Sequence, residues 1–177
     1  VWGVESKNFW LRKSFIFPFA ILTISIASNK LDNAGFDQFY LLLLLSFFIF
    51  TAFKTAKQVL FTGKIDGNKI LGAICLYLLL GLIWAVLYTL LQLDFSNSFQ
   101  TMQQNKEWFM LFPDFVYFSF VTMTTLGFGD ISPNLPVARF LVYLEAIVGQ
   151  FYMAILVASL VGSRMSNLSS KQELNKK

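Results

Sequence analysis

Long apolar segments separated by short polar ones set the pattern of this chain. Four of them have the character of membrane-spanning helices: residues 9–28, 36–53, 70–93 and 136–162. Crossing the hydrocarbon core of a bilayer takes about 20 apolar residues. The first segment has an uninterrupted core of only residues 15–27, so it spans if Arg12 and Lys13 extend their charges toward the interface. The pattern predicts an all-α membrane protein with four transmembrane helices.

A fifth apolar stretch, residues 115–123, is too short to span. Asp114 follows Pro113 and is a reasonable N-cap for a helix of about a dozen residues. That length suits a re-entrant helix. Irregular backbone after such a helix is tolerated at membrane depth where other protein or a water-filled path covers it. The predicted fold class is therefore four spanning helices plus one re-entrant helix and a following strand.

The composition also indicates a membrane protein. Hydrophobic residues make up 56% of the 177 residues and charged residues 14%, compared with about 25% charged in soluble domains. Histidine is absent and Cys75 is the only cysteine. These two facts exclude a disulfide framework, a Cys/His metal site within one chain and catalysis by histidine. We therefore expect neither an enzyme nor a bound cofactor.

The basic residues lie mostly at the ends of the apolar segments, and the net charge is +4. Charge in these places more often sets membrane orientation than binds nucleic acid, so no nucleic-acid partner is expected. With the N-terminus inside, eleven of the 14 lysines and arginines face the cytoplasm. The positive-inside rule predicts that both termini are cytoplasmic, and we expect a multi-pass protein of the plasma (cell inner) membrane.

Residues 124–130, Thr-Thr-Leu-Gly-Phe-Gly-Asp, lie between the re-entrant helix and the last spanning segment. Two glycines that alternate with larger residues let a short strand adopt backbone angles closed to other residues. In that conformation successive carbonyl oxygens can point the same way. Several copies around an axis would form stacked rings of oxygens, which replace the hydration shell of a potassium ion.

The stretch resembles the T-V-G-Y-G-D signature of potassium-channel selectivity filters, with Leu126 for valine and Phe128 for tyrosine. The order of elements over residues 70–165 is similar to the pore module of that family. The resemblance implies that membrane lipids and K⁺ are partners, and that a filter strand from each of four subunits makes a homotetramer. It also implies K⁺ coordination at Thr125, Leu126, Gly127 and Phe128, with Gly129 completing the filter.

Residues near the filter are candidates for supporting it. Thr124 ends the half-helix, and Asp130 would raise the local cation concentration at the outer mouth. Tyr117 keeps an aromatic hydroxyl on the pore helix, whereas Phe128 lacks one. Glu145 is the only acidic residue deep in an apolar helix, which makes it a functional candidate. A structural brace that hydrogen-bonds the pore helix or filter strand is favoured over a permeation or pH-sensing role.

The last spanning segment carries the gating candidates. Gly149 lies nineteen residues after Asp130, where the family often has a hinge glycine. The alternative is close packing of small residues between membrane helices. Further along, residues at helical spacing would line the lower pore, where an apolar ring can gate by dewetting, or would pack on neighbouring helices. They are Val157, Ala158, Val161 and Met165.

The predicted organisation is an N-terminal segment with a helical pair at 1–62, a pore domain at 63–165 and a short cytoplasmic tail at 166–177. The favoured function is a potassium-selective channel that conducts K⁺ passively. A less selective monovalent cation channel is the alternative, because Leu126 and Phe128 depart from the commonest filter. A non-conducting membrane scaffold or receptor subunit is the alternative of another class.

Overall fold

The computed structural model describes residues 34–61, 67–100 and 107–174, and most of them are helical. The elements in chain order are α2 (Ala34–Phe61), α3 (Gly67–Asp94), β1 (Phe99–Gln100), α4 (Trp108–Met123), β2 (Ser132–Pro133) and α5 (Pro136–Leu174). Three helices are long and apolar enough to cross a membrane, namely α2, α3 and α5. The predicted all-α membrane class is confirmed. The first predicted span, residues 9–28, lies outside the described residues.

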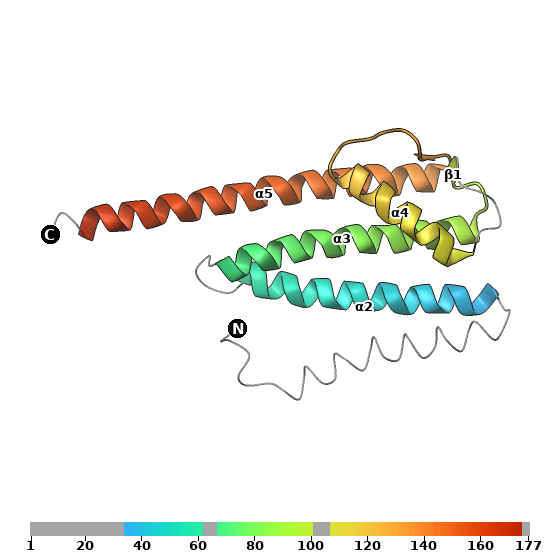
Figure 1. Ribbon diagram of the computed structural model, residues 1–177, viewed down its shortest axis with the longest axis horizontal. Coiled ribbons are helices and arrows are strands. Elements are labelled where there is room, and N and C mark those ends of the chain that lie inside the picture. Colours follow the sequence, from blue (N-terminus) through green and yellow to red (C-terminus); the bar gives the residue numbers. More distant parts are fainter. Residues whose placement is uncertain (1–33, 62–66, 101–106, 175–177) are drawn as a thin grey trace, which may run out of the picture.

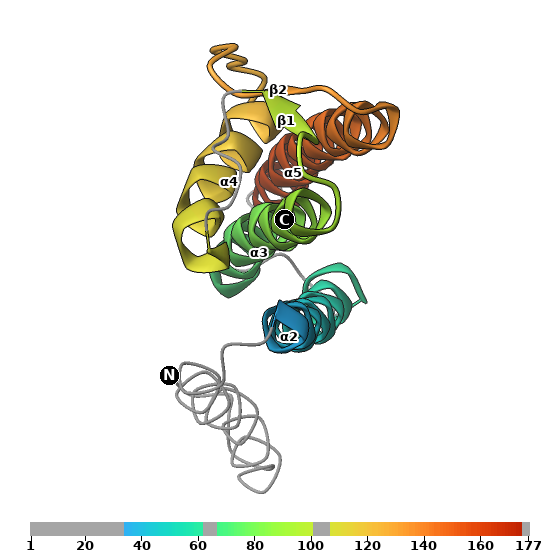
Figure 2. The same ribbon diagram turned by 90° about the vertical axis from the view of Figure 1, so that its right-hand side faces the viewer.

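The long helices run side by side, and α3 lies between the others (Figures 1 and 2). Helix α2 packs on one side of α3. Helices α4 and α5 lie on the other side, and the short α4 crosses at a tilt near one end of the bundle (Figure 1). Small residues permit close approach, since a Cβ at Gly72 of α3 would come within 2.9 Å of Val59 on α2. Such contacts are typical of helix packing in membranes.

The spanning helices are longer than their apolar cores. Helix α2 continues past residue 53 to Phe61, and α5 continues past residue 162 to Leu174. Helix α5 begins at Pro136, as the sequence predicts, because proline suits the first helical position. Since α5 crosses residue 165 as one helix, most of the predicted tail is helical. The predicted division into domains stays a prediction.

Helix α4 corrects one prediction. It begins at Trp108, with Glu107 as its N-cap, so Asp114 is not the N-cap and Pro113 lies inside the helix. The additional N-terminal turn is held by tertiary contacts that local propensity does not contain. The indole of Trp108 donates a hydrogen bond to the carboxylate of Asp37 on α2, and its ring lies 4.8 Å from that of Tyr40.

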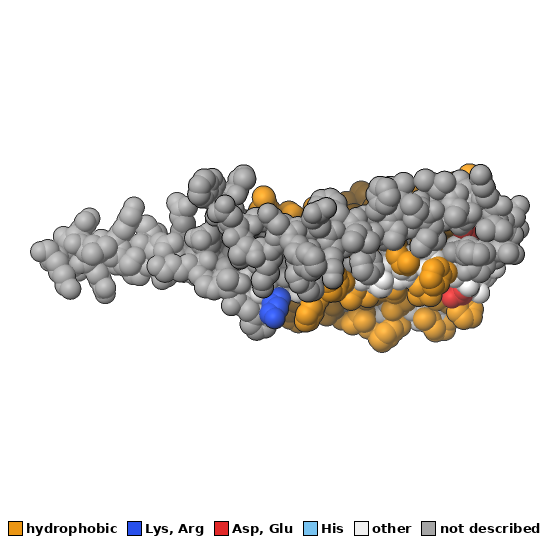
Figure 3. All heavy atoms as spheres, turned by 90° about the horizontal axis from the view of Figure 1, so that it is seen from below, with side chains coloured by type: hydrophobic (Ala, Val, Ile, Leu, Met, Phe, Trp, Pro, Cys, Tyr) orange, Lys and Arg blue, Asp and Glu red, His pale blue; other side chains and the backbone are white. Residues whose placement is uncertain are grey.

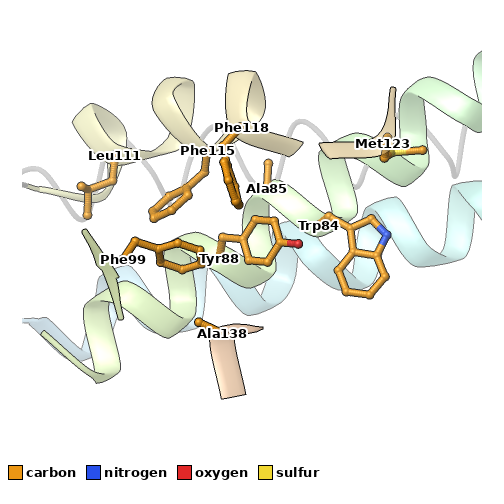
Figure 4. Packing of buried hydrophobic residues seen from close by; sticks show 9 residues of the cluster. All are labelled: Trp84, Ala85, Tyr88, Phe99, Leu111, Phe115, Phe118, Met123 and Ala138. Atoms are coloured by element: carbon orange, nitrogen blue, oxygen red, sulfur yellow. The ribbon is translucent and has the colours of Figure 1, made fainter. Parts of the chain in front are cut away.

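An aromatic cluster forms the core where α3, α4 and β1 meet (Figure 4). Phe99 is buried and packs edge-on against Phe115 and Phe118 of α4, with ring centroids 4.9 and 5.5 Å apart. Tyr88 of α3 packs against the same rings. Buried aromatic rings contribute large apolar areas and prefer such edge-to-face geometry. The cluster therefore fixes α4 against α3.

Two short strands connect the loop before α4 with the loop between α4 and α5. Strand β1 pairs antiparallel with β2, with Phe99 opposite Pro133 and Gln100 opposite Ser132. The backbone N–H of Asn134 also donates to the carbonyl oxygen of Ser98, at 2.8 Å. The loop before α4 is thereby tied to the loop that precedes α5.

The outer surface of the described helices is apolar. Seen from below Figure 1, the part that is not grey is mostly hydrophobic along its length (Figure 3). The large exposed side chains of α2 include Phe39, Leu42, Ile49, Phe50 and Phe53. An apolar exterior of this extent is what lipid chains or neighbouring apolar helices cover.

Candidate functional site

Positive φ angles recur at every second residue after α4. Thr125 has φ of 59°, Gly127 of 57° and Gly129 of 80°, whereas the residues between them are not in that region. This alternation is the backbone requirement on which a row of carbonyl oxygens depends. The two glycines supply it as the sequence predicts. The left-handed conformation of Thr125 was not predicted, because threonine carries a Cβ that disfavours it.

The end of α4 anchors this segment. The carbonyl oxygen of Val121 accepts hydrogen bonds from the N–H groups of Leu126 at 3.0 Å and Gly127 at 3.4 Å. The hydroxyl of Thr124 donates to the carbonyl oxygen of Phe120 at 2.6 Å. These bonds satisfy carbonyl groups that a helix end leaves without intrahelical partners. They also bring the negative end of the helix dipole to the start of the segment.

Tyr117 of α4 meets Phe128 and Asp130 of this segment. The rings of Tyr117 and Phe128 are stacked, with centroids 6.4 Å apart and planes 5° from parallel. The Tyr117 hydroxyl donates a hydrogen bond to the Asp130 carboxylate, and this bond raises the pKa of Tyr117. The pore-helix hydroxyl, whose partner the sequence left open, is therefore bonded to Asp130.

Glu145 lies at the meeting point of three helices and is fully buried. Its Oε2 accepts a hydrogen bond of 2.5 Å from the hydroxyl of Tyr88 on α3. Its Oε1 lies 2.5 Å from the Oγ of Ser119 on α4. The contact with the pore helix that the sequence suggested for Glu145 is present. Tyr88 and Ser119 were missed, and their polar oxygens within apolar helices were the available signal.

Gly149 lies against the end of α4. A Cβ on it would come within 2.9 Å of the carbonyl oxygen of Met123 and 3.1 Å of its Cα. Helix α5 is continuous through this position. Close packing, the alternative to a hinge, is therefore what the structure displays here, and the hinge stays a prediction.

The predicted lower-pore residues lie farther along α5. Val157, Ala158 and Val161 are exposed in the single chain. The side chain of Met165 lies outside the described part of the structure. Their predicted role in gating stays a prediction.

The predicted filter segment is exposed in the part of the chain that the structure describes. All residues from 124 to 130 are exposed, including the large side chains of Leu126 and Phe128. A Cβ placed on Gly127 or Gly129 would meet no atom within 4 Å. Within the described residues, no group of three or more cysteine, aspartate and glutamate side chains could hold a metal ion.

Comparison with known protein families identifies a match for this chain. A family model described as an ion channel matches residues 72–165, which is more than half of the chain. The matched region contains most of α3, the whole of α4, the segment with alternating positive φ and most of α5. No curated protein and no solved structure gives a significant match.

Proposed function

Since this chain belongs to the potassium-channel-like family of ion channels, we propose that it conducts K⁺ passively and selectively across the plasma membrane. The observation that carries the proposal is the positive φ at Thr125, Gly127 and Gly129, directly after a helix too short to span. The ions would bind the backbone oxygens of residues 125–128 and the Thr125 hydroxyl. The exchange of water for these oxygens is what selectivity filters provide.

The proposed assembly is a homotetramer with the filter on its axis. One chain carries one filter segment, and that segment is exposed on one side. Polar backbone at membrane depth requires protein or a water-filled path around it. Four copies related by rotation supply both, because each covers its neighbour and together they enclose the path.

The test of selectivity is a bi-ionic reversal potential on purified full-length protein in planar bilayers, with K⁺ on one side and Na⁺ on the other. We expect current to reverse far toward the potassium equilibrium potential. Reversal near zero would contradict the proposal and favour a less selective monovalent cation channel. Absence of current under varied voltage, pH and calcium would favour a non-conducting scaffold or receptor subunit.

A pair of glycine variants links that result to the filter. In Gly127→Ala the new Cβ meets nothing within 4 Å in the chain, but φ of 57° is strained for alanine. We expect it to reduce K⁺ selectivity or abolish current. Gly162→Ala is the matched control, because its Cβ also has open space but no positive φ is present there. Equal reversal potentials in both variants would argue against the filter assignment.

A further inference from the structure

Five oxygen atoms form a continuous path through the buried carboxyl group of Glu145. The Tyr88 hydroxyl lies 2.5 Å from Oε2, and the Ser119 Oγ lies 2.5 Å from Oε1. The same Ser119 Oγ lies 2.9 Å from the backbone carbonyl oxygen of Gly81 on α3. Tyr88, Ser119 and Glu145 all have no exposed surface. The path therefore begins and ends on α3 and passes through α5 and α4.

Proton counting decides how these contacts are made. A serine hydroxyl has one proton to donate, and a backbone carbonyl oxygen has none. If Glu145 were ionised, Ser119 would donate its one proton to Oε1. The 2.9 Å contact between Ser119 Oγ and the Gly81 oxygen would then contain no proton. If Glu145 is protonated, it donates to Ser119 Oγ, and Ser119 donates to Gly81. Only the second arrangement places a proton in every contact.

The surroundings favour the same protonation state. In the part of the chain that the structure describes, the polar contacts of the carboxyl group are the hydroxyls of Tyr88 and Ser119, with no lysine or arginine among them. A buried carboxylate without a cation is costly, and more so within a membrane. Two neutral hydroxyls do not offset that cost as a counter-ion would.

We propose that Glu145 is a neutral carboxylic acid that donates its proton to Ser119, closing a one-way chain of hydrogen bonds. The chain runs from the Tyr88 hydroxyl to the Glu145 carbonyl oxygen, from the Glu145 hydroxyl to Ser119, and from Ser119 to the carbonyl oxygen of Gly81. It makes Glu145 a positioning residue that holds α4 between α3 and α5 without placing a fixed charge behind the filter.

The close approach at Gly81 supports this role. A Cβ there would come within 2.6 Å of the Phe120 ring, so α3 and α4 touch where Ser119 reaches the Gly81 oxygen. Val121 follows Ser119 by two residues on α4, and its carbonyl oxygen accepts hydrogen bonds from the N–H groups of Leu126 and Gly127. Displacement of α4 at Ser119 would therefore move the start of the filter.

Infrared difference spectroscopy on the purified full-length protein tests the protonation state. We expect a carbonyl band of a protonated carboxylic acid at neutral pH, lost in Glu145→Gln. The matched control is Glu107→Gln, because Glu107 is exposed and makes no side-chain capping bond; it should keep the band. A wild-type spectrum without the band, or a band that persists in Glu145→Gln, would overturn the proposal.

Tyr88→Phe tests the direction of the hydrogen-bond chain. It also provides a test of the proposal if Glu145→Gln does not fold. It removes the donor to the Glu145 carbonyl oxygen, so the band should persist at a higher frequency. An unshifted band would show that Tyr88 does not donate to it. Because the amide of Glu145→Gln can donate to Ser119 and accept from Tyr88, that variant should unfold near the wild-type temperature, and Glu145→Ala well below it.

Equal losses of thermal stability in Glu145→Gln and Glu145→Ala would count against the hydrogen-bond chain. The inference concerns the packing of α4, α5 and α3 around the filter and holds whichever cation the pore conducts. Its failure would leave the proposed selectivity standing, and failure of the selectivity experiment would leave this inference standing.

Discussion

Thr125 shows at the scale of one residue that the filter segment is shaped against local preference. Its φ of 59° lies in a region that costs a residue with a Cβ about 1–2 kcal/mol. Such strain persists where surrounding contacts fix the backbone, and it clusters at functional sites. Here the N–H of Thr125 donates to the carbonyl oxygen of Thr122 at 3.0 Å. The proposed role of Thr125 as a ligand to the ion explains why this position is not glycine.

The stacked pair of Tyr117 and Phe128 leads to a prediction about filter stability. Phe128 has no hydroxyl with which to hydrogen-bond the pore helix, so we expect conduction to fall faster in low potassium than with a tyrosine filter. Phe128→Tyr should slow that loss, measured as current decay after potassium is withdrawn. Phe109→Tyr, a change on the exposed side of α4, is the control. Faster decay in Phe128→Tyr would refute the argument.

The hydrogen bond between Tyr117 and Asp130 leads to a second prediction. Tyr117→Phe keeps the ring that stacks on Phe128 but removes the donor to the carboxylate. We expect earlier collapse of current during sustained opening, because Asp130 is then free to reorient at the outer mouth. Tyr143→Phe, at an exposed position of α5, should behave as wild type. Identical current decay in the two variants would show that the bond does not hold the filter.

At the scale of elements, the contact between α4 and α5 distinguishes packing from hinging at Gly149. Its Cβ would come within 2.9 Å of the Met123 carbonyl oxygen, whereas a Cβ at Gly162 of the same helix would meet nothing within 4 Å. Overpacking costs roughly 1–3 kcal/mol, and Gly→Ala in an open helix position gains up to about 1 kcal/mol. Gly149→Ala should therefore lower the temperature of thermal unfolding, and Gly162→Ala should not.

The two interpretations of Gly149 differ in what else changes. A hinge glycine replaced by alanine alters the fraction of time that the pore is open while the protein remains as stable as wild type. Replacement of a packing glycine by alanine lowers the stability of the folded protein, whether or not pore opening changes. Single-channel recording and the unfolding measurement together distinguish the two interpretations. Unchanged stability with altered opening in Gly149→Ala would support the hinge.

At the scale of the whole molecule, the exposed filter predicts assembly from four copies. Wild-type chains mixed with Gly127→Ala chains should give tetramers in which one altered strand impairs the pore. Current should then fall with the fourth power of the wild-type fraction, because every subunit contributes to one filter. Current in simple proportion to that fraction would show that each chain conducts by itself.

Membrane orientation is a second prediction at this scale. Both termini are expected in the cytoplasm, and the loop between α3 and α4 outside. Starting from Cys75→Ser, which removes the only cysteine, single cysteines can be placed at Asn97 and Lys57. A membrane-impermeant thiol reagent applied from outside should label the first and not the second. The reverse labelling would invert the topology.

The sequence predicted most of the helices because long apolar runs determine them. Helix α3 ends within a residue of the prediction and α5 begins at the predicted Pro136. The start of α4 was wrong because Trp108 is held by Asp37 and Tyr40, which come from another helix. Pro113 is tolerated there although it usually marks a helix start.

The predicted filter stretch could be located from its glycines, because glycine is the residue that most readily adopts a positive φ. The partners of Glu145 could not. Which oxygens meet a buried carboxyl group depends on the rotation of three helices about their axes, and a uniformly apolar helix such as α3 gives little indication of which face turns inward. The polar oxygens of Tyr88 and Ser119 mark them in the sequence as candidates, but only the assembled bundle identifies them as the partners of Glu145.

The length of α5 has a mechanical consequence. At 39 residues and about 1.5 Å per residue, it measures roughly 58 Å, while the hydrocarbon core is about 30 Å thick. One end directly follows the loop of residues 124–135, and the helix is longer than the hydrocarbon core that it would cross. The helix can therefore act as a lever with Gly149 and Met123 near its fulcrum. A modest sideways pull on its far end would deliver torque to the segment that carries the alternating positive φ angles.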